Sequence, residues 1–176
     1  MKLFRCLICG EAYMGSFKPT NCPFCGAPEE YLAAGKDWVD ENLSISELSE
    51  VSRANLTKAL QLEVNNSAFY RDAMNRTRDT ELQGLFKYLS KVEAEHASTL
   101  RKILKSDTPP PEPGKDAATD DDRRNLELAS EREAHAKAFY EESARAAAEP
   151  RVKRVFEAIS RIEGDHLAIH KGMLGK

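Results

Sequence analysis

Two four-residue stretches carry side chains that could hold a metal ion, Glu93-Ala94-Glu95-His96 and Glu163-Gly164-Asp165-His166. In each stretch a carboxylate precedes an imidazole by three residues, about one helical turn, so both groups project from the same face of a helix. Apolar residues at helical spacing surround both pairs and predict that this face is buried. A buried carboxylate is costly unless it is compensated, so a metal ion is one interpretation and a half-exposed ion pair is the other.

The two stretches belong to an internal repeat. Glu93 and Glu163 are 70 residues apart (163 − 93), and so are His96 and His166 (166 − 96). Four further pairs share this offset: Glu63 with Glu133, Phe69 with Phe139, Tyr70 with Tyr140, and Phe86 with Phe156. The repeat predicts two copies of a helical hairpin. It also favours the metal interpretation, because two of the four histidines in the chain fall on it.

Four long helices are expected to position these side chains. Capping boxes at Ser44–Glu47 and Thr80–Gln83 predict where helices begin, with a break allowed near Ser52. Proline is accepted in a first helical turn, so Pro150 is expected to begin the fourth helix. The first three helices are expected to end near Met74, Lys105 and Ala148.

The segment 108–122, rich in proline and then in aspartate, joins the two hairpins. It is either a flexible linker between domains or a crossover within one bundle. Its fifteen residues reach roughly 46 Å if extended at ~3.1 Å each, and a helix of about 25 residues is roughly 38 Å long. Because neither hairpin alone would enclose its polar stripe, we expect a mainly α fold: a four-helix bundle with a long crossover between its second and third helices.

All four cysteines lie in the first 25 residues, as two C-x-x-C pairs that are each followed by glycine: Cys6, Cys9 and Gly10, then Cys22, Cys25 and Gly26. Such paired knuckles supply four thiolates to one tetrahedral metal ion, either a structural zinc or a redox-active iron. Trp38 either docks this small module on the bundle or packs locally. We place the module at residues 1–36, a linker with a short helix at 37–51, and the bundle at 52–176.

The composition argues against a disordered protein, a nucleic-acid-binding protein and a membrane protein. Hydrophobic residues make up 41% of the 176 residues, enough for a core, and the net charge of −3 gives no electrostatic case for nucleic acid or an anionic membrane surface. No apolar run approaches the roughly 20 residues of a membrane span, and the N-terminus lacks the apolar region of a signal peptide. We therefore expect a cytoplasmic protein.

The helical part carries the ligand set of ferritin-like di-iron carboxylate bundles. Glu63 and Glu133 would each project inward from the first and third helices, and the repeated E-x-x-H pairs from the second and fourth. The repeat would give each metal one terminal glutamate and one histidine, with the E-x-x-H carboxylates between the metals. Carboxylates with a few imidazoles suit iron or manganese.

Four other side chains are placed less firmly by the pattern. Tyr70 and Tyr140 share the same offset from Glu63 and Glu133, so they either hydrogen-bond to site carboxylates or pack as core aromatics. His135 is expected at the surface. His170 lies one turn beyond His166 and is either a further donor beside the site or exposed, and we expect it to be exposed.

With the cysteine module first and the carboxylate bundle second, the whole chain resembles a rubrerythrin of the reverse type, which has a rubredoxin-like module ahead of its ferritin-like bundle. The resemblance implies that four residues hold a mononuclear iron, Cys6, Cys9, Cys22 and Cys25. It implies that six residues hold a di-iron pair, Glu63, Glu93, His96, Glu133, Glu163 and His166, with Glu93 and Glu163 bridging.

The resemblance also implies a function, a non-haem di-iron peroxidase that defends against oxidative stress. It would reduce hydrogen peroxide to water with electrons relayed through the four-cysteine iron from an external reductase or rubredoxin. Rubrerythrins are generally head-to-tail homodimers, in which the thiolate-bound iron of one subunit serves the di-iron site of the other. The alternatives are a ferroxidase or iron-handling protein, and a structural zinc ribbon on a metal-binding bundle.

The chain departs from the rubrerythrin pattern at one position. The family typically has a further carboxylate one turn beyond the ligand on the third helix, linked to a redox-dependent exchange of iron ligands. This chain has Ala136 there. The departure weakens the implied peroxidase activity but not the implied metal binding.

Overall fold

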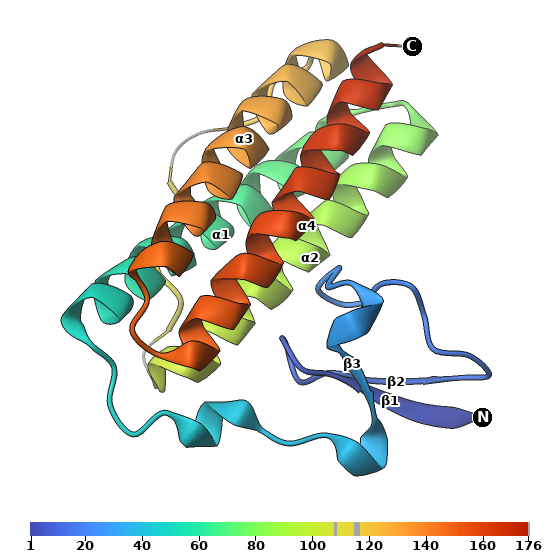
Figure 1. Cartoon of the computed structure of the whole chain (residues 1–176). Coiled ribbons are helices and arrows are strands. Elements are labelled where there is room, and N and C mark those ends of the chain that lie inside the picture. The colour runs from blue at the N-terminus through green and yellow to red at the C-terminus, as the bar shows by residue number, and fades with distance from the viewer. Residues whose placement is uncertain (108, 115–116, 176) are drawn as a thin grey trace.

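The computed structural model describes residues 1–107, 109–114 and 117–175 of the chain. It consists of a small sheet and four long helices (Figure 1). The sheet contains β1 (Lys2–Cys6), β2 (Ala12–Gly15) and β3 (Leu32–Ala34) in the order β2-β1-β3, and both pairs are antiparallel. Four residues that the predicted crossover and bundle include, Thr108, Lys115, Asp116 and Lys176, lie outside the described residues.

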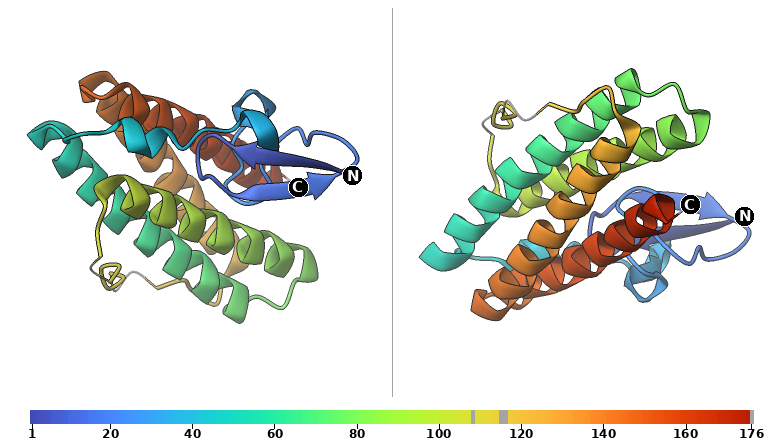
Figure 2. Two further views of the ribbon diagram at one scale, coloured as in Figure 1. Left: turned by 90° about the horizontal axis from the view of Figure 1, so that it is seen from below. Right: turned by 90° about the horizontal axis from the view of Figure 1, so that it is seen from above.

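The helices are α1 (Glu50–Arg76), α2 (Thr80–Leu104), α3 (Asp122–Ala146) and α4 (Pro150–Leu174). Helix α1 packs along α2 and α3 packs along α4, as two hairpins joined into one bundle (Figures 1 and 2). The mainly α fold that the repeat predicts, a ferritin-like four-helix bundle after a small cysteine module, is therefore confirmed. Among the described helices, none combines the length and the apolar character that spanning a bilayer requires.

The start of α1 differs from the prediction. The hydroxyl of Ser49, not Ser44, caps the helix by accepting a 3.2 Å hydrogen bond from the amide of Ser52. Residues Glu41–Ser44 form the short 3-10 helix η3 instead, and α1 continues through Ser52 without a break. Glu149, just before α4, accepts a 2.6 Å hydrogen bond from the amide of Ser49. This contact spans 100 residues, so a local capping pattern cannot reveal it.

The start of α2 falls where it was predicted, but its cap is another residue. The Asp79 carboxylate accepts hydrogen bonds of 2.8 and 3.0 Å from the amides of Glu81 and Leu82, so Thr80 is the first helical residue and not the cap. Pro150 occupies the first turn of α4, as predicted.

The crossover interpretation of the proline-rich segment is confirmed by what its described residues contact. The carbonyl of Glu112 accepts from Gln61, the amide of Gly114 donates to Asn65, and the amide of Ala118 donates to Asp72. All three partners lie on α1, one after another along its length. The described residues of the segment thus follow α1 along the bundle, and α3 starts parallel to α2 (Figure 1).

Trp38 packs within the small module, after the 3-10 helix η2 (Gly35–Asp37). Its indole N–H donates a 3.0 Å hydrogen bond to the carbonyl of Cys6, and the Arg5 guanidinium lies 3.4 Å from its ring centre. The local interpretation of this residue therefore holds, and other residues dock the module.

Candidate metal centres

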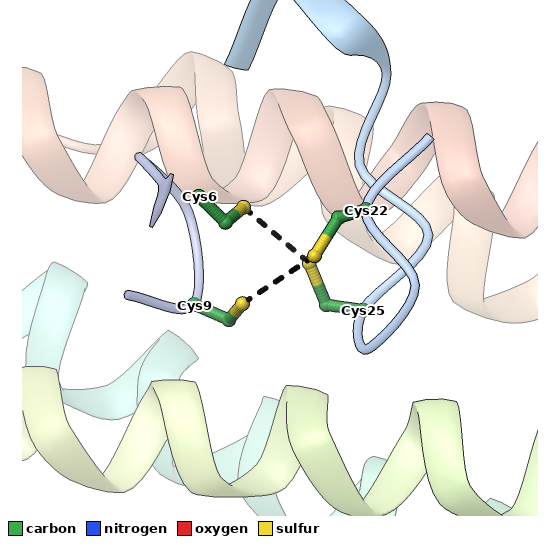
Figure 3. A group of neighbouring side chains, drawn as sticks. All are labelled: Cys6, Cys9, Cys22 and Cys25. Atoms are coloured by element: carbon green, nitrogen blue, oxygen red, sulfur yellow. Dashed lines mark hydrogen bonds between the residues drawn. The ribbon is translucent and has the colours of Figure 1, made fainter. Parts of the chain in front are cut away.

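The four cysteines form one buried cluster. Cys6 ends β1 and Cys9 lies in the following turn, while Cys22 and Cys25 come from a second turn (Figure 3). Gly10 and Gly26 follow the second cysteine of each pair with φ of 85° and 78°, a left-handed conformation that favours glycine. Their amides donate to the carbonyls of Cys6 and Cys22 at 3.0 and 2.9 Å, which closes both turns.

The spacing of the sulfur atoms fits a tetrahedral metal site. Sγ of Cys6 lies 3.7 Å from Sγ of Cys25, and Sγ of Cys9 lies 3.8 Å from Sγ of Cys22. A disulfide needs about 2.05 Å, whereas four thiolates at about 2.3 Å from a tetrahedral ion stand about 3.8 Å apart. The amide of Ile8 also lies 3.3 Å from the sulfur of Cys6 and donates to it, as thiolate knuckles require. The donor set therefore fits one iron or zinc ion.

The bundle holds the cysteine module through backbone carbonyls of the first knuckle. Arg151, near the start of α4 and only 5% exposed, donates to the carbonyls of Leu7 and Ile8 at 2.6 and 2.7 Å. Lys102 on α2 donates to the carbonyl of Cys9 at 3.1 Å. The module thus lies against α2 and α4 (Figure 2), and its cysteines belong to the same apolar cluster as residues of the bundle.

Replacing Arg151 with methionine is expected to loosen the module without unfolding the bundle. Methionine keeps the apolar stem but leaves two buried carbonyls without their donor, which costs about 1–3 kcal/mol per unsatisfied group. Hydrogen exchange should therefore accelerate in residues 6–10 of the variant and stay unchanged in α1. Arg154→Met is the matched control, because Arg154 lies on the same helix, is 43% exposed and pairs only with Glu41 among the contacts described. Equal exchange in both variants would contradict this role of Arg151.

The six predicted bundle ligands are brought together at the centre of the four helices. Two overlapping groups have ligand atoms within 4.8 Å of one another: Glu63, Glu93, His96 and Glu163, and Glu93, Glu133, Glu163 and His166. Both groups contain Glu93 and Glu163, one from each E-x-x-H pair. None of the six residues is more than 4% exposed. The geometry is that of two adjacent cation positions with two carboxylates between them.

Each imidazole directs Nδ1 towards the carboxylates. Nδ1 of His96 lies 3.0 Å from Oε2 of Glu93 and 3.4 Å from Oε1 of Glu163. Nδ1 of His166 lies 3.2 Å from oxygens of both glutamates. Nδ1 is thus the atom of each histidine that a metal ion would bind.

The four carboxyl groups divide into two kinds. Burial raises the pKa of Glu63 and Glu133 well above their usual range, and the nearby Glu93 and Glu163 carboxylates add to this. Burial acts in the same direction on Glu93, but hydrogen bonds from His166 and His96 outweigh it and lower its pKa. The pKa of Glu163 is lowered in the same way, against burial and the charge of Glu93. Without a metal, these directions favour a protonated Glu63 and Glu133 beside an ionised Glu93 and Glu163.

The histidines complete this charge balance. Burial disfavours the imidazolium of His96, but hydrogen bonds with Glu163, Glu63 and Glu93 raise its pKa well above the usual value. Burial likewise disfavours the imidazolium of His166, but hydrogen bonds with Glu163 and Glu93 outweigh it and raise the pKa to about 9. These raised pKa values favour imidazolium ions that would balance the Glu93 and Glu163 carboxylates in the metal-free site.

Unsatisfied oxygen atoms test whether metal ions fit this site. Among the described residues, one oxygen of each carboxylate is buried and has no short, well-aligned donor: Oε2 of Glu63, Oε1 of Glu93, Oε2 of Glu133 and Oε1 of Glu163. Three of these oxygens face only an imidazole Nδ1, at 3.7 Å for Glu63, 3.2 Å for Glu93 and 3.4 Å for Glu163. Buried acceptors without donors are rare in native proteins because each one is costly. Two divalent cations would satisfy all four oxygens and replace the charge of four protons, so the donor set fits a pair of divalent metal ions.

Two tyrosines hold the terminal glutamates from across the bundle. The hydroxyl of Tyr70 on α1 donates to Oε1 of Glu133 on α3, and the hydroxyl of Tyr140 on α3 donates to Oε1 of Glu63 on α1. Both tyrosines are fully buried. Each phenol occupies one oxygen of its glutamate and leaves Oε2 available to a metal. The geometry thus favours the hydrogen-bonding interpretation of these residues over simple packing.

Comparison with known proteins identifies the family. The model of the family described as Rubrerythrin matches residues 54–174, more than half of the chain. The chain belongs to the rubrerythrin family. It is a ferritin-like, metal-binding protein, as the resemblance in its sequence implied.

Two individual matches accompany the rubrerythrin family model. Reverse rubrerythrin-1 of Clostridium acetobutylicum is 33% identical over 114 residues, which cover 59% of this chain and 62% of that protein. The match therefore spans less than two thirds of the length of that relative. A solved structure, described as a hypothetical protein from Pyrococcus furiosus, covers 70% of this chain and 88% of its own, with a TM-score of 0.60 and 18% identity. At this identity it supports the fold alone.

The departure from the rubrerythrin pattern at Ala136 is visible in the core. Its methyl group is fully buried in the apolar cluster that also contains Tyr140, so no carboxylate is available one turn beyond Glu133. The ligand exchange that the resemblance associates with that position has no acidic side chain here to carry it.

Sequence reasoning misplaced one histidine of this rubrerythrin. His170 was expected at the surface but is fully buried, with Nε2 2.9 Å from the hydroxyl of Tyr70. It lies four residues after His166 and so on the same buried face of α4, which is the signal that could have placed it correctly. Burial lowers the pKa of His170 to about 4, with a contribution from His166, so its ring is neutral near pH 7. His135 is exposed, as expected.

Proposed function

We propose that this chain is a peroxidase that reduces hydrogen peroxide to water and protects against oxidative stress. The balanced reaction consumes one peroxide, two electrons and two protons and yields two waters. The observation that carries the proposal is the position of His96, whose Nδ1 faces the carboxylate cluster while its Nε2 donates a 2.9 Å hydrogen bond to the carbonyl of Cys25. One side chain therefore connects the two candidate metal centres.

The residues of the two centres have separate roles in this proposal. Glu63 with His96 and Glu133 with His166 would be terminal ligands, with Glu93 and Glu163 bridging, and the four cysteines would hold the mononuclear ion. Two iron ions in the bundle would supply the two electrons that cleave the O–O bond, and a third iron in the cysteine site would return them singly. Manganese in the bundle and zinc among the cysteines are the competing metals.

The protein part of the proposed relay is short. Cys25 contributes Sγ to the cysteine cluster and its carbonyl to His96. Next to it, a Cβ on Gly26 would lie 3.1 Å from Cγ2 of Ile162, so any larger residue would push the Ile162 side chain on α4 aside. The hydrogen bond and this contact hold the second knuckle against the ligand-bearing turns of α2 and α4.

The relay lies within a single chain. It supports electron transfer without a second subunit, whereas the resemblance implies transfer between the subunits of a head-to-tail homodimer. An external reductase or rubredoxin remains the proposed electron donor, and the homodimer remains a prediction from the resemblance.

The proposal is tested by peroxide consumption with the iron-loaded full chain and a reductase that reduces rubredoxins. Glu93→Gln removes the charge of one proposed bridging ligand and is expected to lower kcat at least about 100-fold, since even indirect partners of a metal ligand are worth 10–100-fold. The matched control is Glu131→Gln, which changes an exposed carboxylate on α3. This variant should consume peroxide at the wild-type rate. If the wild-type chain oxidises ferrous iron with oxygen but does not consume peroxide, the ferroxidase alternative replaces this proposal.

A further inference from the structure

The two halves of the bundle site differ at one position of the repeat. All six candidate ligands and both tyrosines have a counterpart of the same type 70 residues away, but the counterpart of His170 is Leu100 (170 − 100). Both side chains are fully buried. The half of the site on α4 therefore contains the imidazole of His170, and the equivalent position on α2 contains the alkyl side chain of Leu100.

His170 extends the hydrogen-bond chain that ends on Glu133. Its Nε2 lies 2.9 Å from the hydroxyl of Tyr70, whose proton is directed to Oε1 of Glu133. The ring also stacks on Tyr70, with centroids 5.8 Å apart and planes inclined by 18°. Because the phenol donates to Glu133, its oxygen accepts from His170, which places the imidazole proton on Nε2. Among the described atoms, Nδ1 of His170 has no hydrogen-bond partner.

The other half of the site lacks this third member. Tyr140 donates to Glu63, and its ring packs on Phe156 with centroids 5.6 Å apart. Leu100 can neither donate to nor accept from the phenol. The hydrogen bonds of a chain polarise one another, so a phenol that accepts from an imidazole is a stronger donor than one that accepts nothing.

We propose that His170 is a positioning residue that acts through Tyr70 on Glu133 and makes the two metal positions of the bundle unequal in affinity. A more strongly held Oε1 fixes the Glu133 carboxylate beside the metal position that it would share with His166, whose Nδ1 lies 3.7 Å from this oxygen. The position between Glu133 and His166 binds a divalent ion more tightly than the position between Glu63 and His96. This inference rests on the proposed metal site but not on peroxidase activity.

The test is a cobalt titration of the full chain with zinc already in its cysteine site, followed by the visible absorption of Co(II) bound in the bundle. Wild type is expected to need two dissociation constants that differ by about tenfold, the lower end of what partners of a metal ligand contribute. His170→Leu copies the residue of the other half and should bring the two constants together by weakening the tighter one. His170→Gln keeps a side-chain donor and should restore part of the difference. His135→Leu, an exposed histidine-to-leucine change, should alter neither constant.

A double-mutant cycle shows whether His170 acts through Tyr70. Tyr70→Phe alone should weaken the same position, and adding His170→Leu to it should change nothing further. This single variant also carries the test if His170→Leu loses its helical circular dichroism. Two constants that His170→Leu leaves unchanged, or an effect of equal size in the Tyr70→Phe background, would overturn the inference while leaving the proposed function standing. A wild-type bundle that binds no cobalt would overturn both.

Discussion

Binding two divalent ions in the bundle is expected to release about four protons near pH 7. In the metal-free site, Glu63 and Glu133 keep their protons because burial raises their pKa, and His96 and His166 are protonated because neighbouring carboxylates raise theirs. Ligands must lose these protons to bind metal. The four positive charges that leave equal those of two divalent ions, so the net charge of the buried site does not change.

The sign of the pH dependence follows from the same groups. Each has a raised pKa, so at low pH a metal ion must displace bound protons, and its affinity should increase as pH rises towards the pKa of about 9 for His166. Titration calorimetry in two buffers of different ionisation enthalpy counts the released protons directly. Glu63→Gln should reduce the count by about one, whereas Glu131→Gln on the exposed face of α3 should leave it unchanged. Metal uptake without proton release would contradict the assigned charge states.

Replacing Cys9 with serine is expected to unfold the cysteine module while the four helices persist. The module has only three short strands, and thiolate-bound metal in small modules contributes about 10–16 kcal/mol to folding. The variant should therefore lose the metal of this site and become open to proteolysis throughout residues 1–40. Its bundle should melt at a lower temperature, because the cysteine cluster covers part of the same apolar core.

Limited proteolysis with metal analysis measures this outcome. Ser16→Ala, an exposed position in the same module, is the matched control and should resist cleavage like wild type. The Cys9→Ser protein should still bind two ions in the bundle, yet turnover with an external donor should stop. A protected N-terminal segment in a metal-free variant would show that strand pairing and packing alone hold the module.

The bundle site can be predicted from the sequence because its ligand residues occur twice, at a constant offset of 70 residues. One offset relates Glu63, Glu93 and His96 to their counterparts, and helical periodicity places them on buried faces, so six side chains converge as expected. Ser44 was a wrong helix start because the cap at Ser49 is stabilised by Glu149, which is distant in the sequence.

Residues that break the repeat were harder to place. His170 has no counterpart of its own type, and a lone histidine is usually polar surface, so only its spacing from His166 indicated burial. Arg151 carries no local signal at all, because its partners are distant in the sequence: the backbone carbonyls of Leu7 and Ile8 and the side chain of Asn42. Contacts of that kind depend on how the module docks, which a pattern of residue types does not encode.

The most direct test of the proposed relay is a single turnover of the fully reduced, iron-loaded chain with one equivalent of hydrogen peroxide, followed by stopped-flow absorption. We expect the bundle irons to be oxidised first and the ferric–thiolate absorption of the cysteine site to appear afterwards, as its electron moves through Cys25 and His96. A chain with zinc among its cysteines should show the first phase only. A thiolate iron that stays reduced while the bundle is oxidised, or a reduced chain that does not react with peroxide, would contradict the account.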